Sequence, residues 1–287
     1  MDILASVLVP VLIDAIAVLG LYVISASGRL SAGHAVFFGI GGYASGLVST
    51  RLGLPPVVSL IAGIVLAAVV AVVFSLISDR LSHWFFAVAT LAFLTMMISL
   101  VSGLDALGGA TGLYGIPLAV GLKATVVALV LAIGVVIVFD RSRIGRAVRA
   151  IRDSELAAQS LAINPTAVRA FAFALGAGFA GLAGGLWSHS IGLIKPADMS
   201  IERSLLYLIF LYIGGADLWV GALFGTFLLS LLPELLRFSG AYRLVMFGGL
   251  LTVVMILHPA GLITRLELDR LKALIRPAAA ARAREVG

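Results

Sequence analysis

The sequence predicts an all-α integral membrane protein: a polytopic helical bundle of about eight to ten transmembrane helices, with nine as the best count. First, 61% of the 287 residues are hydrophobic and only 12% are charged, whereas a soluble domain carries about 25% charged residues. Second, the mean hydropathy is +1.16, and lipid accepts such a surface where water does not. Third, apolar runs long enough to cross a bilayer recur along the chain.

The apolar runs define nine expected spans. A spanning helix needs roughly 20 mostly apolar residues, and lipid does not satisfy open backbone groups, so these segments are helices rather than strands. The first resembles the apolar part of a signal peptide, but no basic residue precedes it, so we expect a retained helix. The expected spans are residues 3–25, 31–50, 56–78, 84–102, 121–139, 166–189, 203–215, 218–236 and 243–258.

Glycine-rich stretches interrupt this pattern twice. Residues 103–117 contain five glycines and a proline, and residues 214–221 contain a Gly-Gly pair and Asp217. Irregular backbone at membrane depth is tolerated where it is buried in protein or lines a cavity. Each stretch is therefore either a broken or re-entrant segment on a translocation path, or an ordinary surface turn.

Glycines also cluster inside two of the expected spans, at residues 39–46 and 176–185. Small residues at helical spacing let the backbones of neighbouring helices approach closely. We therefore expect these two helices to pack tightly within the bundle.

Positive charge gives the orientation. Of 20 Lys and Arg residues, six lie in residues 141–169 and six in residues 265–287. Basic residues in connections beside apolar spans are typical of the cytoplasmic side of a membrane, and this clustering argues against nucleic-acid binding. We thus expect a transmembrane domain, residues 1–264, with a cytoplasmic loop at 141–166, and a basic cytoplasmic tail at 265–287.

Counting spans from the cytoplasmic loop places the remaining charges. Arg29 and the Asp79-Arg80 pair fall inside, whereas Arg51 and Asp105 fall outside. The N-terminus then lies outside, and the tail lies inside if residues 203–236 cross the membrane twice.

The cytoplasmic loop is amphipathic over residues 144–162, with small apolar residues on one face and arginines on the other. Ser154 is placed to cap a second short helix, and Asn164-Pro165 ends it. We expect one or two short helices parallel to the membrane, lying on lipid headgroups or in a groove on a partner protein. The apolar strip consists of Ala147, Val148, Ile151, Leu156, Ala158 and Leu161.

No motif for a cofactor is present. The sequence lacks G-x-x-x-x-G-K-[ST], so the chain has no phosphate-binding loop for ATP, and any energy from ATP must come from another subunit. It has no cysteine, and its four histidines lack metal-ligand spacing. Ser188-His189-Ser190 places its side chains apart on a helix, which disfavours an intramembrane hydrolase.

Asp14 is the clearest ionisable residue inside a span. Such residues are candidates for function because a charge in lipid is costly. One interpretation is a proton or cation site of a secondary transporter. The other, which we favour because Asp14 stands alone, is a polar contact between helices.

Five blocks of sequence, in order, resemble the LivM-type permeases of branched-chain amino acid ABC importers. The cytoplasmic loop is similar to their coupling loop, and the stretch around Ser31-Ala32-Gly33-His34 is similar to their N-terminal L-S-x-G-H-A motif. Together the blocks cover most of residues 30–263. They lie at residues 30–43, 111–117, 145–164, 171–187 and 231–262.

The chain departs from the family pattern at three places. Ala162 stands where the family has glycine, Asp217 interrupts its usual G-G-x-G-T, and Ala222 replaces a proline. These departures put the shape of the turn after the coupling loop, and the working of the 214–221 segment, in doubt.

The resemblance implies the ABC importer permease fold and a transport subunit that is not an enzyme, binds no cofactor and leaves ATP and Mg²⁺ to its partners. It implies a bacterial inner membrane location, a LivH-type permease as heterodimer partner, two ABC ATPase subunits and a periplasmic binding protein. The implied ATPase-coupling residues are Arg146, Arg149, Arg152, Glu155, Ala157, Ala158 and Asn164. The implied translocation-pathway residues are Ser31, Gly33, His34, Phe37, Phe38, Tyr43, Thr111 and Gly112.

The substrate stays open at this point. Branched-chain amino acids fit the resemblance best, but importers of urea and short-chain amides, or of another amino acid, have similar permeases. A proton-coupled transporter that uses Asp14 is the more remote alternative.

Overall fold

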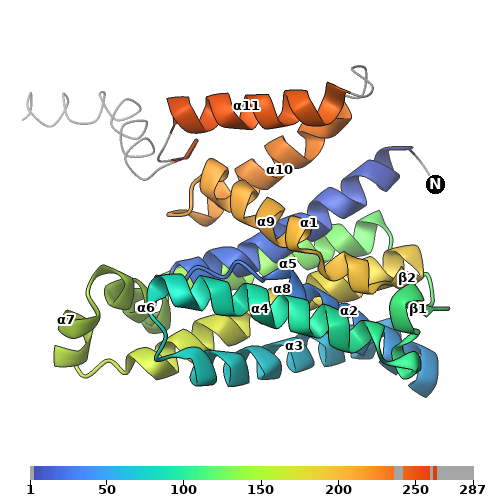
Figure 1. Cartoon of the computed structure of the whole chain (residues 1–287), viewed down its shortest axis with the longest axis horizontal. Coiled ribbons are helices and arrows are strands. Elements are labelled where there is room, and N and C mark those ends of the chain that lie inside the picture. Colours follow the sequence, from blue (N-terminus) through green and yellow to red (C-terminus); the bar gives the residue numbers. More distant parts are fainter. Residues whose placement is uncertain (1–2, 236–241, 259–260, 264–287) are drawn as a thin grey trace, which may run out of the picture.

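The computed structural model describes residues 3–235, 242–258 and 261–263, and it shows a bundle of helices (Figure 1). All nine predicted spans are helical, so the all-α prediction is confirmed. They are α1 (Ile3–Ser25), α2 (Ala35–Leu52), α3 (Pro56–Ser78), α4 (His83–Ser102), α5 (Leu122–Arg141), α8 (Pro165–Ile191), α9 (Ile201–Gly214), α10 (Trp219–Leu235) and α11 (Arg243–Leu257). The predicted tail, residues 265–287, lies outside the described residues.

The number of crossings is a separate question, and nine is not established. Among the described residues, five helices are long and apolar enough to span a membrane: α1, α3, α4, α5 and α8. A sixth candidate is the pair α9 and α10, which is bent by 118° at its break. At 14 and 17 residues, each is shorter than the roughly 20 residues of a span.

Helix α8 lies at the centre of the bundle and packs against α1, α2 and α3. The glycine clusters make this possible. A Cβ atom at Gly41 of α2 would overlap the backbone of Gly181 in α8, and one at Gly184 of α8 would overlap the carbonyl of Phe38. The prediction that the two glycine clusters pack tightly is confirmed.

The two ends of the bundle differ (Figure 1). At one end lie α6 (Arg143–Asp153) and α7 (Glu155–Ser160). At the other end β1 (Leu113–Tyr114) pairs antiparallel with β2 (Leu193–Ile194), with Leu113 opposite Ile194. The short helices η1 (Asp105–Leu107), η2 (Gly109–Thr111) and η3 (Pro196–Met199) flank these strands in sequence.

The charges are distributed over these ends as the sequence predicts. Arg29 and Asp79 pair with each other at the α6–α7 end, where Arg169 also contacts Asp79. Arg51 instead donates to the carbonyl of Ala106, beside η1. The relative sides are therefore confirmed.

The two glycine-rich interruptions have different structures. Residues 103–117 form η1, η2 and β1 at the end opposite α6. Residues 214–221 contain the turn between α9 and α10, where Gly215 adopts a φ of +119°. The chain after α11 returns to this turn, since the Leu262 N–H donates to the Ile213 carbonyl at 2.8 Å and the Ile263 N–H to the Gly214 carbonyl at 2.9 Å.

Candidate functional site

The loop at residues 141–166 folds as two short helices because serine and asparagine side chains cap the helix ends. The Gly145 N–H donates to Ser142 Oγ at 3.0 Å at the start of α6, and the Ala157 N–H donates to Ser154 Oγ at 3.3 Å at the start of α7. Asn164 caps α8 through the Ala167 N–H at 3.2 Å. Both the two-helix prediction and the cap at Ser154 are confirmed.

The turn after α7 is strained at the position where the sequence departs from the family. Ala162 has a φ of +59°, and among the described residues it is the one non-glycine residue with a positive φ. The Ile163 N–H reaches the Ala158 carbonyl and the Ala162 N–H reaches the Gln159 carbonyl. This is the Schellman pattern, whose left-handed position favours glycine.

The apolar strip of the loop divides into a buried part and an exposed part. Val148, Ile151 and Ala158 are at most 3% exposed, whereas Leu156 is 80% exposed and Leu161 is 73% exposed. Part of the predicted apolar strip thus packs against the bundle itself, and part of it stays free to contact lipid or a partner protein. Helix α7 has only six residues, and it packs against the bundle through the face that carries Ala158. Ala157 lies on the exposed face. Two leucines thus project from the polar end of the bundle.

Two of the predicted coupling arginines have partners inside the chain. Arg149 donates to Asp140 Oδ1 at 3.1 Å and to the Asp140 carbonyl at 2.7 Å, and the Tyr22 hydroxyl donates to the same carboxylate. This cluster joins α6 to the ends of α5 and α1. Arg152 pairs with Asp217 at 3.2 Å, which joins α6 to the α9–α10 turn. Arg146 is exposed and donates to the Arg141 carbonyl.

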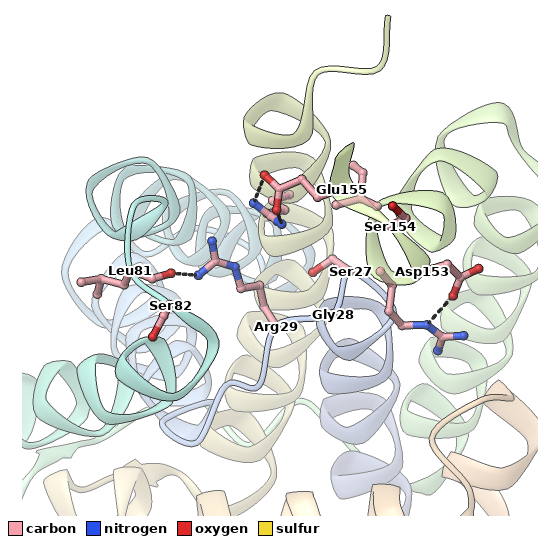
Figure 2. Close-up of a pocket in the computed structure, with 11 residues that line it drawn as sticks. Ser27, Gly28, Arg29, Leu81, Ser82, Asp153, Ser154 and Glu155 are labelled. Carbon is pink, nitrogen blue, oxygen red and sulfur yellow. Dashed lines mark hydrogen bonds and ion pairs between the residues drawn. The ribbon is translucent and has the colours of Figure 1, made fainter. Parts of the chain in front are cut away.

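Glu155 belongs to a second network, drawn in Figure 2. Its carboxylate accepts hydrogen bonds from Arg169 of α8, and Arg169 also lies 3.5 Å from Asp79. Arg29 extends the network by donating to the Leu81 carbonyl at 2.7 Å. Burial, with Arg169 nearby, lowers the pKa of Arg29, and Asp79 opposes this shift. The network ties α7 to the α1–α2 and α3–α4 connections.

A cavity of about 350 Å³ lies between these groups (Figure 2). Its polar wall carries three arginines and two carboxylates. Gly28 sits against α6 here, because a Cβ at this residue would lie 3.3 Å from the Arg152 Cα. The charged lining residues are Arg29, Arg152, Asp153, Glu155 and Arg169.

The predicted pathway residues on and before α2 lie in the core of the bundle. Ser31, His34, Phe37, Phe38 and Tyr43 are at most 4% exposed. His34 Nε2 lies 3.1 Å from the Ala17 carbonyl of α1. Their role in a pathway stays a prediction, and their observed contacts are those of helix packing.

The other predicted pathway residues have similarly close backbone contacts. Gly33 donates its N–H to Thr90 Oγ1 of α4 at 3.2 Å, and a Cβ there would overlap the Thr90 carbonyl. Thr111 is exposed, and Gly112 packs against the Ile194 carbonyl with a φ of +92°. These close contacts and the positive φ explain why glycine occupies positions 33 and 112.

Asp14 does not stand alone. Its Oδ1 accepts a hydrogen bond from the Tyr207 hydroxyl at 3.0 Å and lies 3.9 Å from the Arg203 guanidinium. Arg203 in turn lies over the rings of Phe38 and Trp187, at 4.4 and 4.6 Å from their centroids. Asp14 thus makes a polar contact between α1 and α9, and its apparent isolation in the sequence is corrected.

His189 also has its own partners. Its Nε2 lies 3.1 Å from Ser45 Oγ of α2, and its Nδ1 lies 3.0 Å from the Pro117 carbonyl. Ser188 and Ser190 instead donate to carbonyls of their own helix. Ser45 and His189 are both fully buried, so this pair joins α2, α8 and the segment before α5.

Sequence reasoning missed the partners of the charged residues. Asp140 and Arg203 were not selected from the sequence, and the orientation count placed Asp79 on the same side as Arg169 without identifying the two as partners. The sequence did indicate that Arg203 needs a partner elsewhere, because the apolar run that it begins contains no acidic residue to pair with it. Tyr207 and Asp14 are 193 positions apart, and no local pattern connects them.

The fold is that of a polytopic membrane protein. The charged α6–α7 loop at one end of the bundle is folded, and ion pairs connect it to several of the membrane helices. Residues 3–258 match the family described as "Branched-chain amino acid transport system / permease component". The chain therefore belongs to this family of transport permeases.

Individual relatives agree with the family. The chain is 29% identical over 284 residues to the high-affinity branched-chain amino acid permease protein LivM of Salmonella typhimurium, covering 84% of this chain and 65% of that protein. It is 29% identical over 277 residues to LivM of Escherichia coli, with the same coverage. BraD of Pseudomonas aeruginosa is 29% identical over 147 residues, which are 50% of this chain and 48% of BraD. No solved structure matches.

The chain thus spans about two thirds of the length of the LivM proteins that it matches.

Proposed function

We propose that this chain is the membrane-spanning permease subunit of an ABC importer for branched-chain aliphatic amino acids. The LivM proteins that it resembles are described as parts of high-affinity branched-chain amino acid transport systems. The α6–α7 end is the cytoplasmic end, and its loop docks on an ATPase subunit. Energy reaches this chain through that contact, because it has no phosphate-binding loop of its own.

The exposed pair Leu156 and Leu161 is the observation that carries the docking proposal. Both leucines lie on α7 or directly after it, at the end of the bundle that carries the ion-pair networks, and both are exposed. Large apolar side chains exposed among polar residues mark surfaces that a partner protein covers. Arg143 and Arg146 are exposed on the neighbouring helix and supply a positive rim.

The ion-pair networks explain how docking reaches the membrane. A force on α7 acts on α8 and the α3–α4 connection through Glu155, Arg169 and Asp79. A force on α6 acts on α5 through Arg149 and on the α9–α10 turn through Arg152. The ion pairs therefore hold both helices of the loop against the bundle, so that a movement of the docked ATPase is passed on to the membrane helices.

The complete proposal includes the partners. A LivH-type permease forms the other half of the pore, two ABC ATPases dock on the cytoplasmic side, and a periplasmic binding protein delivers leucine, isoleucine or valine. The complex resides in a bacterial inner membrane with the N-terminus of the permease periplasmic and its C-terminus cytoplasmic. The resemblance and the distribution of arginines support this arrangement.

Reconstitution in proteoliposomes tests the function. Uptake of leucine should require ATP and the ATPase subunits, and it should persist with Asp14→Asn, because an asparagine oxygen still accepts the Tyr207 hydrogen bond. Removal of residues 144–162 should abolish co-purification of the ATPases.

Other outcomes would refute parts of the proposal. Leucine uptake without ATP that follows a proton gradient and ends with Asp14→Asn would make the chain a secondary transporter. ATP-driven uptake of urea or short-chain amides, with no uptake of aliphatic amino acids, would replace the substrate. ATPases retained on the truncated loop would refute the docking assignment.

A further inference from the structure

A second cavity lies in the opposite half of the molecule, among α1, α9, α10 and α11. Its volume is about 430 Å³, within the range of about 300–1,000 Å³ typical of small-molecule sites. Most of the wall is apolar, from side chains such as Leu206 and Phe210, but two carboxylates also line it: Asp14 of α1 and Glu202 of α9.

The acidic character of this cavity is not neutralised by the nearby cation. Arg203 is shared between two carboxylates, since it lies 3.9 Å from Asp14 and 3.7 Å from Asp198. Glu202 is exposed and forms no ion pair with any residue that the structure describes. Glu202 therefore places an unpaired negative charge at a cavity whose wall is mostly apolar, and such a charge favours a cationic ligand group.

The wall also offers hydrogen-bond acceptors. Ser230 Oγ of α10 is buried and has no hydrogen-bond partner among the residues that the structure describes, and Ser230 lines the cavity. Pro233, inside α10, has no N–H to donate to the carbonyl of Leu229, four residues earlier. An alkylammonium group has three donors and no acceptor, so it matches this set of oxygens.

We propose that the cavity lined by Glu202, Ser230, Leu206, Phe210 and Phe247 binds the substrate inside the permease, with its ammonium group at Glu202 and Ser230 and its aliphatic side chain against the apolar wall. The inference rests on the proposed function and adds to it a location for the substrate within this chain, together with the residue that binds its ammonium group. It also moves the expected substrate contacts from α2 to α1, α9 and α10.

The absence of cysteine from the chain makes an accessibility experiment clean. Ser6 lines the cavity and is exposed, and Ser6→Cys is conservative in size. In the assembled transporter, leucine should slow the reaction of this cysteine with a small thiol reagent. The amine 3-methylbutylamine, which keeps the ammonium and the branched chain, should protect in the same way. The acid 4-methylpentanoate, which lacks the ammonium, should not.

Thr111→Cys is the matched control. Thr111 is exposed in η2 and belongs to the pathway set predicted from sequence. We expect its reactivity to be unchanged by leucine. Protection at Thr111 with none at Ser6 would place the substrate elsewhere and overturn the inference, as would equal protection of Ser6→Cys by the acid and the amine.

A second variant tests the charge directly. Glu202→Gln should lower leucine uptake at saturating binding protein about tenfold, because a neutral acceptor replaces the carboxylate and the ion pair with the ammonium group is lost. Asp105→Asn removes a carboxylate outside the cavity and should leave uptake unchanged. Wild-type uptake by Glu202→Gln overturns the inference while ATP-driven leucine transport still stands. If the wild-type complex transports no aliphatic amino acid with ATP, the proposed function fails, and the inference fails with it.

Discussion

Helix α2 and the α6–α7 loop were both selected from the sequence as functional, and they turn out to be held in place in different ways. The motif residues of α2 are buried against α1, α4 and α8, where glycines allow backbones to touch. The loop is fixed by ion pairs at the end of the bundle and leaves two leucines exposed. A family motif can therefore record how helices pack as well as where a partner binds.

The largest expected effect comes from α2. Gly41→Leu places a side chain against the backbone of Gly181, and neither helix can move without disturbing the bundle. We expect the free energy of unfolding to fall by about 3 kcal/mol, seen as a lower melting temperature in detergent. Gly134→Ala is the control, because a Cβ there meets nothing within 4 Å, and a stability at or above wild type is expected. Equal behaviour of the two variants would contradict the packing account of α2.

In the loop, the ion pairs of Arg169 should matter most. Its side chain is 11% exposed and serves both Asp79 and Glu155. Arg169→Met should cost about 2 kcal/mol, between the values for exposed and buried pairs, and it should loosen α7 as measured by faster hydrogen exchange of its amides. Arg141→Met, at an exposed position, should change neither quantity. Unchanged exchange in Arg169→Met would mean that the network does not hold the loop.

The strained turn predicts a smaller change of opposite sign. Ala162→Gly removes the penalty of a positive φ, about 1–2 kcal/mol, and adds the flexibility cost of glycine, about 0.5–1 kcal/mol. A net gain of about 0.5 kcal/mol should raise the melting temperature slightly. Ala157→Gly, within α7, should lower it. Two shifts of the same sign would show that Ala162 is not strained.

The Arg152–Asp217 pair should have the smallest effect. Its side chains are 33% and 53% exposed, so Asp217→Asn should cost about 0.3 kcal/mol and lose even that at high salt. Thermal unfolding at low and high ionic strength measures it. A large, salt-independent loss would show that the α9–α10 turn depends on this contact more than its exposure allows.

Much of the fold was predictable because helices in lipid follow from local composition. The nine helical segments, the cap at Ser154 and the grouping of Arg29 with Asp79 all come from patterns within short stretches or from counting spans. The sequence also indicated which residue of this turn departs from the family, Ala162, but the strain became evident only from its positive φ.

The side-chain partners were not predictable, because they depend on how helices rotate against one another. Nothing local indicates that Arg149 turns inward to Asp140 while Leu156 turns outward. The same holds for Glu202, which matters only because α9 faces α1 across a cavity. The spacing of hydrophobic residues identifies a helix, but it does not show which residues of a neighbouring helix its side chains will contact.

The docking of the loop on an ATPase subunit is the central claim, and the affinity of the purified ATPase for the permease tests it most directly. The double variant Leu156→Asp and Leu161→Asp should weaken binding at least about tenfold, since exposed apolar anchors dominate protein interfaces. Leu118→Asp is the matched control, because Leu118 is 73% exposed near β1, away from the loop. The account predicts loss of binding in the double variant alone. Wild-type affinity in the double variant would contradict it.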